Sequence, residues 1–463
     1  MRERFKEKPY PLFVFAEGII PAASVWTGAR LWVEAFRNAG LKPGDRVVVA
    51  LPPSAAWLQV FVAGVWEGLT LALVPPTNDA ATIDDAVSAT DARAAICEFD
   101  GGDYFNADPY AGAASTPDAL RKTRFPATPD ARFLLRTSGT NGGTGGRGRW
   151  IALSDSNVLA VVDSHLPHLA LCEETSRVLS VLPWSHAFGL VIDLLPAIFS
   201  GAEIHRDPHG GRDVSALLEA FAHTGITDCS MVPLTAKRLM ATETGREFLL
   251  SLQGGVVGGA NVDETLAAFL RGSRLRVGYG QTEASPGIAL GAPGYFPHGG
   301  YIGVPVGCET RLEEGDDTGT LYFRGANACA GEWSPDTGFA PLAASDWRDT
   351  GDIVRTTDTG DLLFTGRVDG CFKLANGRAI VAEPLENALR SAIPFLENVL
   401  LCSNDGETLE VASDQPLPRQ TVATVLGSLG ALLGVVRVVP AEAFVYTAKG
   451  TLRRRETLQN IVP

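Results

Sequence analysis

Residues 133–149 read FLLRTSGTNGGTGGRGR, a short β-rich run that ends in a loop of hydroxyl and glycine residues. The same arrangement, an apolar run that ends in a Gly, Pro or Ser/Thr loop, recurs in RVVVALPP (46–53), RVLSVLPW (177–184), ITDCSMVP (226–233) and LRVGYGQTE (275–283). Helical patterns separate such runs, as around Gly28 to Ala39. This alternation predicts an α/β fold of mostly parallel sheets flanked by helices. Ligands of such folds bind at the carboxyl ends of the strands, where these loops lie.

The pattern changes towards the C-terminus. Short strands and turns are expected between Asp346 and Asp369, followed by a helix around 384–391, strands in LENVLLCSN (396–404) and TLEVASD (408–414), and a helix near 421–433. We therefore predict a large N-terminal domain, residues 1–367, and a small α+β C-terminal domain, residues 370–463. Residues 99–130, which are rich in Asp, Ala, Gly and Pro, are interpreted as a surface connection.

Composition limits the classes of protein that fit. The 463 residues are 45% hydrophobic and 20% charged, which is typical of a soluble globular chain with more than one domain. A net charge of -14 argues against non-specific binding to nucleic acid, which needs clustered Lys and Arg. The seven cysteines are scattered and never in CxxC spacing, and no run of about 18 apolar residues occurs. We expect a cytoplasmic protein with reduced thiols, no membrane span and no nucleic-acid partner.

The glycine-rich loop that begins at Thr137 can bind polyphosphate. Its glycines let backbone N–H groups approach phosphate oxygens closely, and Thr137, Ser138 and Thr140 add hydroxyls. Arg147 and Arg149 can add charge-assisted hydrogen bonds. It is not a Walker loop, because no Gly-Lys-Ser/Thr follows. Taken alone, the loop is equally consistent with a mobile surface turn.

A second segment, VGYGQTEASPG (277–287), combines an aromatic residue with a carboxylate. Glu283 is a hard ligand suited to Mg²⁺, which keeps few protein ligands and relies on substrate phosphates. Tyr279 can stack on a base. The alternative is a capped helix start without a ligand.

A third segment joins DTGD (349–352) to TGRVDG (365–370). Asp352 can accept both hydroxyls of a ribose, and Arg367 can reach a hydroxyl or a phosphate. Either piece alone is also typical of an ordinary tight turn.

The order of the motifs along the chain resembles that of the adenylate-forming superfamily. The matching motifs are TSGT (137–140), LPWSHAFG (182–189), VVGGA (256–260), YGQTE (279–283), TGD (350–352), GRVDGCFKLANG (366–377) and TAKGTLRRR (447–455), with a similar N-terminal stretch at 39–76. The superfamily contains acyl-CoA and aryl-CoA synthetases, luciferases, fatty acid–AMP ligases and peptide-synthetase adenylation domains. The resemblance covers nearly the whole chain. It implies an ATP- and Mg²⁺-dependent enzyme with a mobile C-terminal domain.

The resemblance also implies a role for one or more residues in each motif. The implied ATP-binding residues are Thr137, Ser138, Gly139 and Thr140 at the phosphates, Gly258, Gly259, Ala260, Tyr279 and Gly280 at the adenine, and Asp352 and Arg367 at the ribose. Glu283, with Thr140, would bind Mg²⁺, and Thr282 would face the α-phosphate. Asp369 matches the hinge between the domains. His186 matches a segment that borders the carboxylate pocket of acyl-activating relatives, although a histidine without a role is the alternative.

Two departures from the superfamily pattern concern its cationic residues. Four extra residues lengthen the phosphate loop, and counting back from the helix after Ser154 places Arg149 where a lysine is expected. At the C-terminus, alignment on Gly450 places Thr451 at the catalytic lysine position and Lys449 two residues earlier. We predict that Lys449 is the catalytic lysine, and a solvated basic tail is the rival interpretation.

The implied reaction is adenylation of a carboxylic acid and transfer of the acyl group to a thiol. Amino-acid-activating relatives place an aspartate near the segment that matches 182–189, but here no acid precedes Asp193. We therefore predict an apolar, fatty or aromatic acid as substrate. The acceptor is either coenzyme A or the phosphopantetheine of an acyl carrier protein. A catalytically silent adenylate-binding protein is the alternative of another class.

Overall fold

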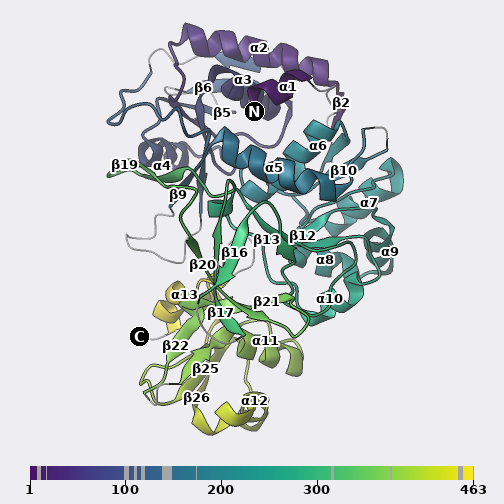
Figure 1. Cartoon of the computed structure of the whole chain (residues 1–463), viewed down its shortest axis with the longest axis vertical. Helices are drawn as coiled ribbons and strands as arrows, with labels where there is room; N and C mark the ends of the chain where they lie inside the picture. The colour runs from purple at the N-terminus through teal and green to yellow at the C-terminus, as the bar shows by residue number, and fades with distance from the viewer. Residues whose placement is uncertain are drawn as a thin grey trace. The chain divides into compact units, whose positions relative to one another are not determined.

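The chain divides into two compact units (Figure 1). The large unit comprises Met1–Thr137, Gly148–Glu309 and Phe323–Trp347, and the small unit holds Thr310–Tyr322 and Arg348–Pro463. The computed structural model describes residues 1–7, 12–16, 18–98, 104–108, 112–115, 120–137, 149–173, 175–313, 317–375, 378–446 and 452–461. The predicted α/β class is confirmed by the sheets and helices below. The predicted domain limits, 1–367 and 370–463 with a hinge near Asp369, remain a prediction.

Within the described residues, the largest sheet of the large unit has nine strands, in the order β19-β18-β9-β8-β4-β3-β5-β6-β7. The strands are β3 (Arg46–Val49), β4 (Thr70–Leu73), β5 (Ala94–Cys97), β6 (Phe105–Asp108), β7 (Gly112–Ser115), β8 (Phe133–Arg136), β9 (Trp150–Leu153), β18 (Gly331–Ser334) and β19 (Gly338–Pro341). The strands from β8 to β6 pair in parallel. The pairs β6–β7, β8–β9, β9–β18 and β18–β19 are antiparallel. The central parallel strands β3, β4 and β5 are buried at every residue, as expected for a parallel sheet covered on both faces.

Two further sheets of the large unit have four strands each in the described part of the chain. One has the order β10-β11-β1-β2 and consists of β1 (Phe13–Phe15), β2 (Gly18–Ile20), β10 (Arg177–Ser180) and β11 (Glu203–Arg206). The other has the order β12-β13-β14-β15 and consists of β12 (Val256–Gly258), β13 (Arg276–Gly280), β14 (Gly287–Leu290) and β15 (Val304–Pro305). The runs predicted at 133–136, 177–180 and 276–280 are therefore strands.

The strand predicted in residues 226–233 is wrong. This segment makes only isolated parallel bridges, from Asp228 to Val178 and Gly254 and from Met231 to Val257. The ladder is interrupted because the backbone N–H of Val256 donates to the hydroxyl of Ser230 at 3.2 Å instead of to a backbone carbonyl.

The interpretation of residues 99–130 as a surface connection is also wrong in part. The segment contains β6 and β7, which extend the nine-stranded sheet. Phe105 is fully buried, with its ring 6.0 Å from that of Trp32 and 5.5 Å from that of Phe36. Burial of this one aromatic side chain outweighs the turn-forming composition around it.

Helices cover the sheets of the large unit (Figure 1). They are α1 (Arg2–Glu7), α2 (Ala22–Asn38), α3 (Ala55–Glu67), α4 (Ala80–Thr90), α5 (Asp155–Leu169), a π-helix (Phe188–Leu194), α6 (Leu195–Ser200), α7 (Val214–Thr224), α8 (Pro233–Met240), α9 (Glu243–Ser251) and α10 (Glu264–Leu270). Helix α3 is buried nearly all round and begins at an N-cap, Ser54, whose hydroxyl accepts from Trp57 N. Among the described residues, no helix has the length and hydropathy needed to cross a membrane.

A stack of aromatic rings joins distant segments in the core. The rings of Trp57 and Phe61 in α3 are stacked 5.0 Å apart, and Phe61 stacks on Phe133 of β8 at 5.5 Å. Trp184 contacts Trp57 at 5.1 Å between ring centroids. All four side chains are buried. Since Trp184 belongs to the predicted motif LPWSHAFG, this stack fixes the motif against the nine-stranded sheet.

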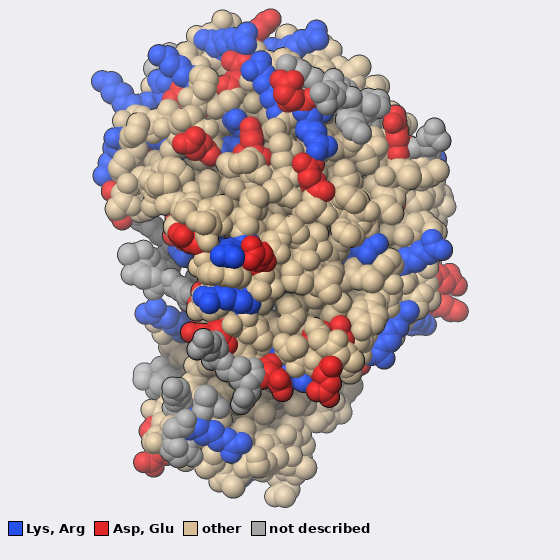
Figure 2. Space-filling model, viewed as in Figure 1, with Lys and Arg blue, Asp and Glu red and all other residues tan. Residues whose placement is uncertain are grey.

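Charged side chains of both signs lie intermixed on the surface. On the face drawn in Figure 2, Lys and Arg lie among Asp and Glu, with wide uncharged areas between them. With a net charge of -14, a phosphate site in this protein must depend on local donors.

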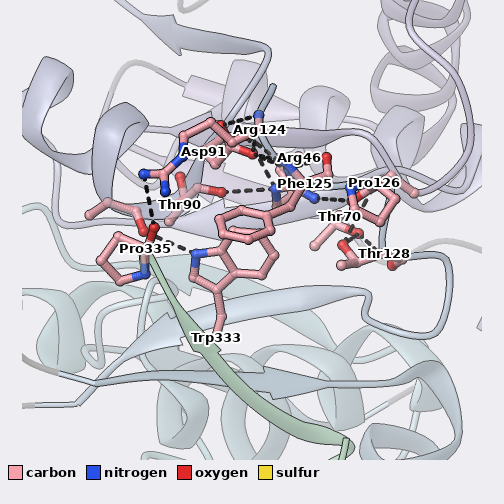
Figure 3. Close-up of polar contacts among 12 residues, drawn as sticks. Arg46, Thr70, Thr90, Asp91, Arg124, Phe125, Pro126, Thr128, Trp333 and Pro335 are labelled. Carbon is pink, nitrogen blue, oxygen red and sulfur yellow. Dashed lines mark hydrogen bonds and ion pairs between the residues drawn. The ribbon is translucent and has the colours of Figure 1, made fainter. Parts of the chain in front are cut away.

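Arg46, at the start of β3, is a buried cation that ties several loops together (Figure 3). It is 1% exposed. Its guanidinium donates to Thr90 O at 2.8 Å, to Pro126 O at 2.7 Å and to Asp91 Oδ2 at 2.8 Å. A buried cation is tolerated only when it is paired and hydrogen-bonded, as it is here.

The same guanidinium fixes strand β18. It lies 4.2 Å from the ring centroid of Trp333, whose Nε1 donates to Ala89 O at 3.0 Å (Figure 3). Trp333 pairs with Trp150 and Glu332 pairs with Ile151 across β18 and β9. The Arg46 cluster therefore holds β18 and Glu332 in a fixed register beside β9.

The small unit has its own sheets and core. Its strands are β16 (Glu309–Leu312), β17 (Thr318–Arg324), β20 (Arg348–Thr356), β21 (Leu362–Arg367), β22 (Cys371–Lys373), β23 (Ala379–Val381), β24 (Val399–Cys402), β25 (Leu409–Ser413) and β26 (Leu433–Val438), and its helices are α11 (Ala382–Ala392), α12 (Arg419–Val425) and α13 (Arg454–Ile461). Helix α11 and strands β24 and β25 confirm the elements predicted there. The predicted helix at 421–433 is instead divided, because Gly427 has a φ of 57° after α12 and a 3₁₀ helix follows at Gly427–Leu432.

We expect Arg46→Met to destabilise the large unit by about 3 kcal/mol, because it removes the cation that pairs with the Asp91 carboxylate and leaves the buried carbonyl of Thr90 without its side-chain donor. Denaturant unfolding followed by tryptophan fluorescence measures the change. Arg37→Met is the matched control, since Arg37 is 59% exposed and its ion pair with Glu67 lies at the surface. Equal shifts of the unfolding midpoint in the two variants would contradict the structural role of Arg46.

Candidate active site

The two ends of the glycine-rich loop meet at adjacent antiparallel strands. Thr137 follows β8 and Arg149 precedes β9, with Arg136 paired to Trp150. The N–H of Thr137 donates to Arg149 O at 2.8 Å, and its hydroxyl donates to the same oxygen at 3.3 Å. The predicted phosphate-binding residues Ser138, Gly139 and Thr140 lie outside the described residues.

Arg149 joins two carboxylates. Its Nη2 donates to Glu283 Oε1 at 3.0 Å and its Nη1 donates to Glu332 Oε1 at 3.0 Å. The exposed fractions of the side chains are 44% for Arg149, 21% for Glu283 and 40% for Glu332. The structure thus brings together three predicted residues, Thr137, Arg149 and Glu283, at the ends of strands from distant parts of the sequence.

Glu283 is held by a short turn. It lies in the 3₁₀ turn Thr282–Ala284, and its backbone oxygen accepts from the N–H of Cys329 at 2.8 Å. Thr282 is half-buried in the same turn. The backbone oxygen of Thr282 accepts a hydrogen bond from the N–H of Ser285 at 3.1 Å. The turn holds the Glu283 backbone in one conformation. This restricts the directions in which its carboxylate can point, as a metal ligand requires.

Close strand packing explains several of the predicted adenine-site glycines. Gly258 pairs with Gly278, and a Cβ on Gly258 would lie 2.4 Å from Gly278 O. A Cβ on Gly280 would lie 1.7 Å from the carbonyl oxygen of Pro286. Glycine is therefore required at both positions for packing, whatever their role towards a nucleotide.

The end of β12 lies beside the LPWSHAFG segment. Gly259 is exposed with a φ of 79°, and a Cβ there would lie 3.6 Å from Cδ1 of Phe188. Ala260 is exposed next to it. His186 is half-buried, its N–H donates to Pro183 O at 3.1 Å, and the π-helix begins two residues later. The structure thus brings the predicted adenine segment and the predicted carboxylate-pocket segment together.

Tyr279 takes a position between solvent and core. It is half-buried and packs against a small apolar cluster that contains Ala284 and Ile288. Its predicted stacking on a base remains a prediction.

A buried polar network lies beneath the LPWSHAFG segment. The hydroxyl of Ser180 donates to Asp193 Oδ2 at 2.6 Å and accepts from Nε1 of Trp184 at 3.0 Å. Arg206 Nη1 donates to Ser180 O at 2.8 Å and to Leu182 O at 2.7 Å. Burial raises the pKa of Asp193 to about 7 and lowers the pKa of Arg206 to about 10.

A second group of predicted residues lies in the small unit. Asp352 and Arg367 face each other across β20 and β21, and Arg367 Nη1 donates to Asp352 Oδ1 at 2.6 Å. Arg367 Nε donates to Asp369 Oδ1 at 3.3 Å. The predicted ribose residues and the predicted hinge residue are therefore in direct contact. The predicted catalytic residue Lys449 lies outside the described residues.

A family model described as AMP-binding enzyme matches residues 25–333, more than half of the chain. The chain belongs to the AMP-binding enzyme family.

Relatives of this AMP-binding enzyme carry names of acid–CoA ligases. The anthranilate–CoA ligase of Pseudomonas aeruginosa is 25% identical over 78% of this chain and 74% of its own. A feruloyl-CoA synthase of an Amycolatopsis species is 26% identical over 76% of this chain and 74% of its own. The o-succinylbenzoate CoA synthetase of Bacillus subtilis, solved with its acyl-adenylate, has a TM-score of 0.79, with 17% identity over 98% of this chain and 96% of its own. The same synthetase solved with ATP and magnesium has a TM-score of 0.77. That last likeness shows that this chain shares the fold of that synthetase.

Sequence reasoning missed two features of this candidate site. Glu332, the second partner of Arg149, lies in a strand of ordinary composition and gives no local signal. The network of Ser180, Asp193 and Arg206 was missed too, although a serine at the end of a buried strand beside a motif could have drawn attention. Both features depend on which strands become neighbours.

We expect Asp193→Asn to remove a pH-dependent loss of stability from this AMP-binding enzyme. The Asp193 carboxyl keeps its proton to about pH 7 in the folded state, whereas an unfolded carboxyl releases it near pH 4. Between these values the folded state binds more protons, so the free energy of unfolding falls as pH rises, by up to about 1.4 kcal/mol per pH unit. Unfolding of both proteins from about pH 4 to about pH 8 measures this slope. An identical pH dependence in both would contradict the raised pKa.

Proposed function

We propose that this protein uses ATP to convert a carboxylic acid to its acyl-adenylate and then transfers the acyl group to the thiol of coenzyme A, giving a thioester. One observation carries the proposal: Arg149 and Glu283 are in contact beside Thr137, at the end of the strand before the glycine-rich loop. This places a cation, a carboxylate suited to Mg²⁺ and a hydroxyl together in a chain of the AMP-binding family.

The first half-reaction needs charge neutralisation more than proton transfer. A carboxylate oxygen forms a bond to the α-phosphorus of ATP, and the bond from that phosphorus to the bridging oxygen of pyrophosphate breaks. Both reactants are anions, so preorganised positive groups lower the barrier. Arg149 supplies a guanidinium at the phosphate loop, and the carboxylate of Glu283 would hold Mg²⁺, which neutralises phosphate charge when bound. The predicted Lys449 would add a third positive charge.

The second half-reaction transfers the acyl group. The thiol sulfur bonds to the acyl carbon, AMP departs with the electron pair of the acyl–oxygen bond, and the thiol proton is released. We propose that the small domain rotates about Asp369 between the two steps. The contact of Arg367 with both Asp352 and Asp369 supports this, because it ties the ribose-binding position to the hinge. The segment KLANG (373–377), part of which lies outside the described residues, would face the thiol.

An aromatic acid is the substrate class we favour. The named relatives act on anthranilate, feruloyl and o-succinylbenzoate groups, all of which are aromatic. Phe188 lies beside the predicted adenine segment, 3.6 Å from where a Cβ on Gly259 would stand, and offers an aromatic surface there. Asp193 is fully buried, bonded to Ser180 and shifted towards its neutral form, so it is unsuited to pair with the ammonium of an amino acid.

The phosphopantetheine of an acyl carrier protein remains an alternative acceptor. A cytoplasmic location is part of the proposal, and the seven free cysteines support it.

Acid-dependent exchange of labelled pyrophosphate into ATP tests the proposal. With Mg²⁺ present and a panel of aliphatic and aromatic acids, we expect exchange that depends on the acid and is fastest with planar aromatic acids. Product analysis with coenzyme A and with a loaded carrier protein then identifies the acceptor. ATP binding without exchange for any acid would show a silent adenylate-binding protein instead.

We expect Lys449→Ala to slow adenylation by about two orders of magnitude, because removal of one preorganised donor costs about 3 kcal/mol of barrier. Pyrophosphate exchange measures the rate, and equilibrium titration with ATP should show nearly unchanged binding. Arg455→Ala in the same C-terminal region is the control. If both variants lose activity equally, the segment acts as a general basic tail and Lys449 is not the catalytic lysine.

A further inference from the structure

Arg149 stands between two carboxylates that the proposed reaction treats differently. One guanidinium nitrogen donates to Glu283 and the other to Glu332, each at 3.0 Å. One positive charge thus faces two negative charges. In the proposed function, Glu283 turns to Mg²⁺ while Arg149 turns to phosphate, so both groups of the Arg149–Glu283 contact gain competing partners in the loaded enzyme.

We propose that Glu332 is a positioning residue for Arg149: it keeps the guanidinium at the phosphate site when Mg²⁺ takes Glu283 away. This inference rests on the proposed function. An arginine that lost both partners would regain rotamer freedom, and ordering it again on phosphate would cost conformational entropy. With Glu332 still bonded to Nη1, the side chain keeps its place and Nη2 is released for the nucleotide.

The backbone under Glu332 is rigid enough for this role. Gly331, Glu332 and Trp333 pair with Ala152, Ile151 and Trp150 of β9. The next residue, Trp333, is buried against Arg46 and bonded to Ala89 O. Strand β18 also pairs with β19 on its other side. A carboxylate on a strand held from both sides can fix the partner that it binds.

Glu332 forms its side-chain ion pair with Arg149. Among the contacts of the described residues, the Glu332 carboxylate bonds only to Arg149. Its side chain is 40% exposed, so it has little part in the core. The half-exposed carboxylate is therefore explained by its effect on Arg149 and not by stability of the strand.

Charge makes the proposal testable, because two models predict opposite signs. If Glu332 acted only through its field, its negative charge would repel the phosphates, and its neutralisation would tighten binding of Mg·ATP. If it positions Arg149, its neutralisation leaves Arg149 more firmly on Glu283 in the free enzyme and less ordered in the complex. Binding of Mg·ATP then weakens.

The experiment is equilibrium titration of the full-length protein with Mg·ATP and, separately, with AMP. For Glu332→Gln we expect the Kd of Mg·ATP to rise about tenfold, because a change of this size corresponds to the loss of one charge-assisted hydrogen bond. The Kd of AMP should be unchanged, since AMP lacks the β- and γ-phosphates. Glu332→Asp should recover part of the loss. Glu309→Gln, which neutralises an exposed glutamate paired with Arg324, is the matched control and should leave both Kd values unchanged.

A double-mutant cycle isolates the route. In an Arg149→Met background, Glu332→Gln should have no further effect on Mg·ATP binding, because its proposed action passes through Arg149. Unchanged or tighter Mg·ATP binding by the single Glu332→Gln variant overturns the inference, as does a loss that persists in the Arg149→Met background. A wild-type protein that binds no Mg·ATP or shows no acid-dependent exchange would overturn the proposed function itself.

Discussion

The contact of Arg149 with Glu283 and Glu332 is the interaction on which the proposed chemistry depends. Two carboxylates a short distance apart repel each other, and a net charge of -14 offers no general relief. The guanidinium resolves this locally, because its planar fork presents separate nitrogens to the two acceptors. The carboxylate suited to Mg²⁺ is therefore paired with a cation in the free protein.

Strand register determines whether that contact can form. Arg149 ends the loop between β8 and β9, Glu332 lies on the other neighbour of β9, and Glu283 comes from the turn after β13. The buried Arg46 fixes β18 through the ring of Trp333. A structural cation in the interior thus sets the place of a functional carboxylate at the surface, and the core specifies the site through the sheet.

The sequence predicted the features that are written in consecutive residues. Apolar runs such as Val47–Val49 predicted the parallel strands. Motif order predicted Thr137, Arg149 and Glu283, which lie together in the large unit. It also predicted Asp352 and Arg367, which are in contact in the small unit. It could not predict Glu332, since the pairing of β18 with β9 joins residues about 180 positions apart. The predicted surface connection at 99–130 was wrong in part, because burial of the Phe105 ring outweighed the turn-forming composition of the segment. The strand predicted at 226–233 was wrong, because the Ser230 hydroxyl interrupts the backbone hydrogen bonds of the strand pair.

The arginine at the expected lysine position has a physical explanation in the strand beside it. A lysine ammonium is a compact point charge that could pair with one carboxylate at a time in a defined geometry. Arginine bonds to Glu283 and Glu332 together, so the replacement and the second carboxylate belong to one arrangement. The predicted phosphate loop ends at this arginine, whose backbone oxygen accepts a hydrogen bond from the N–H of Thr137 at the loop's start. The loop is thus closed at its base by the same residue that holds the carboxylates, which argues for a rebuilt phosphate site and against a decayed one.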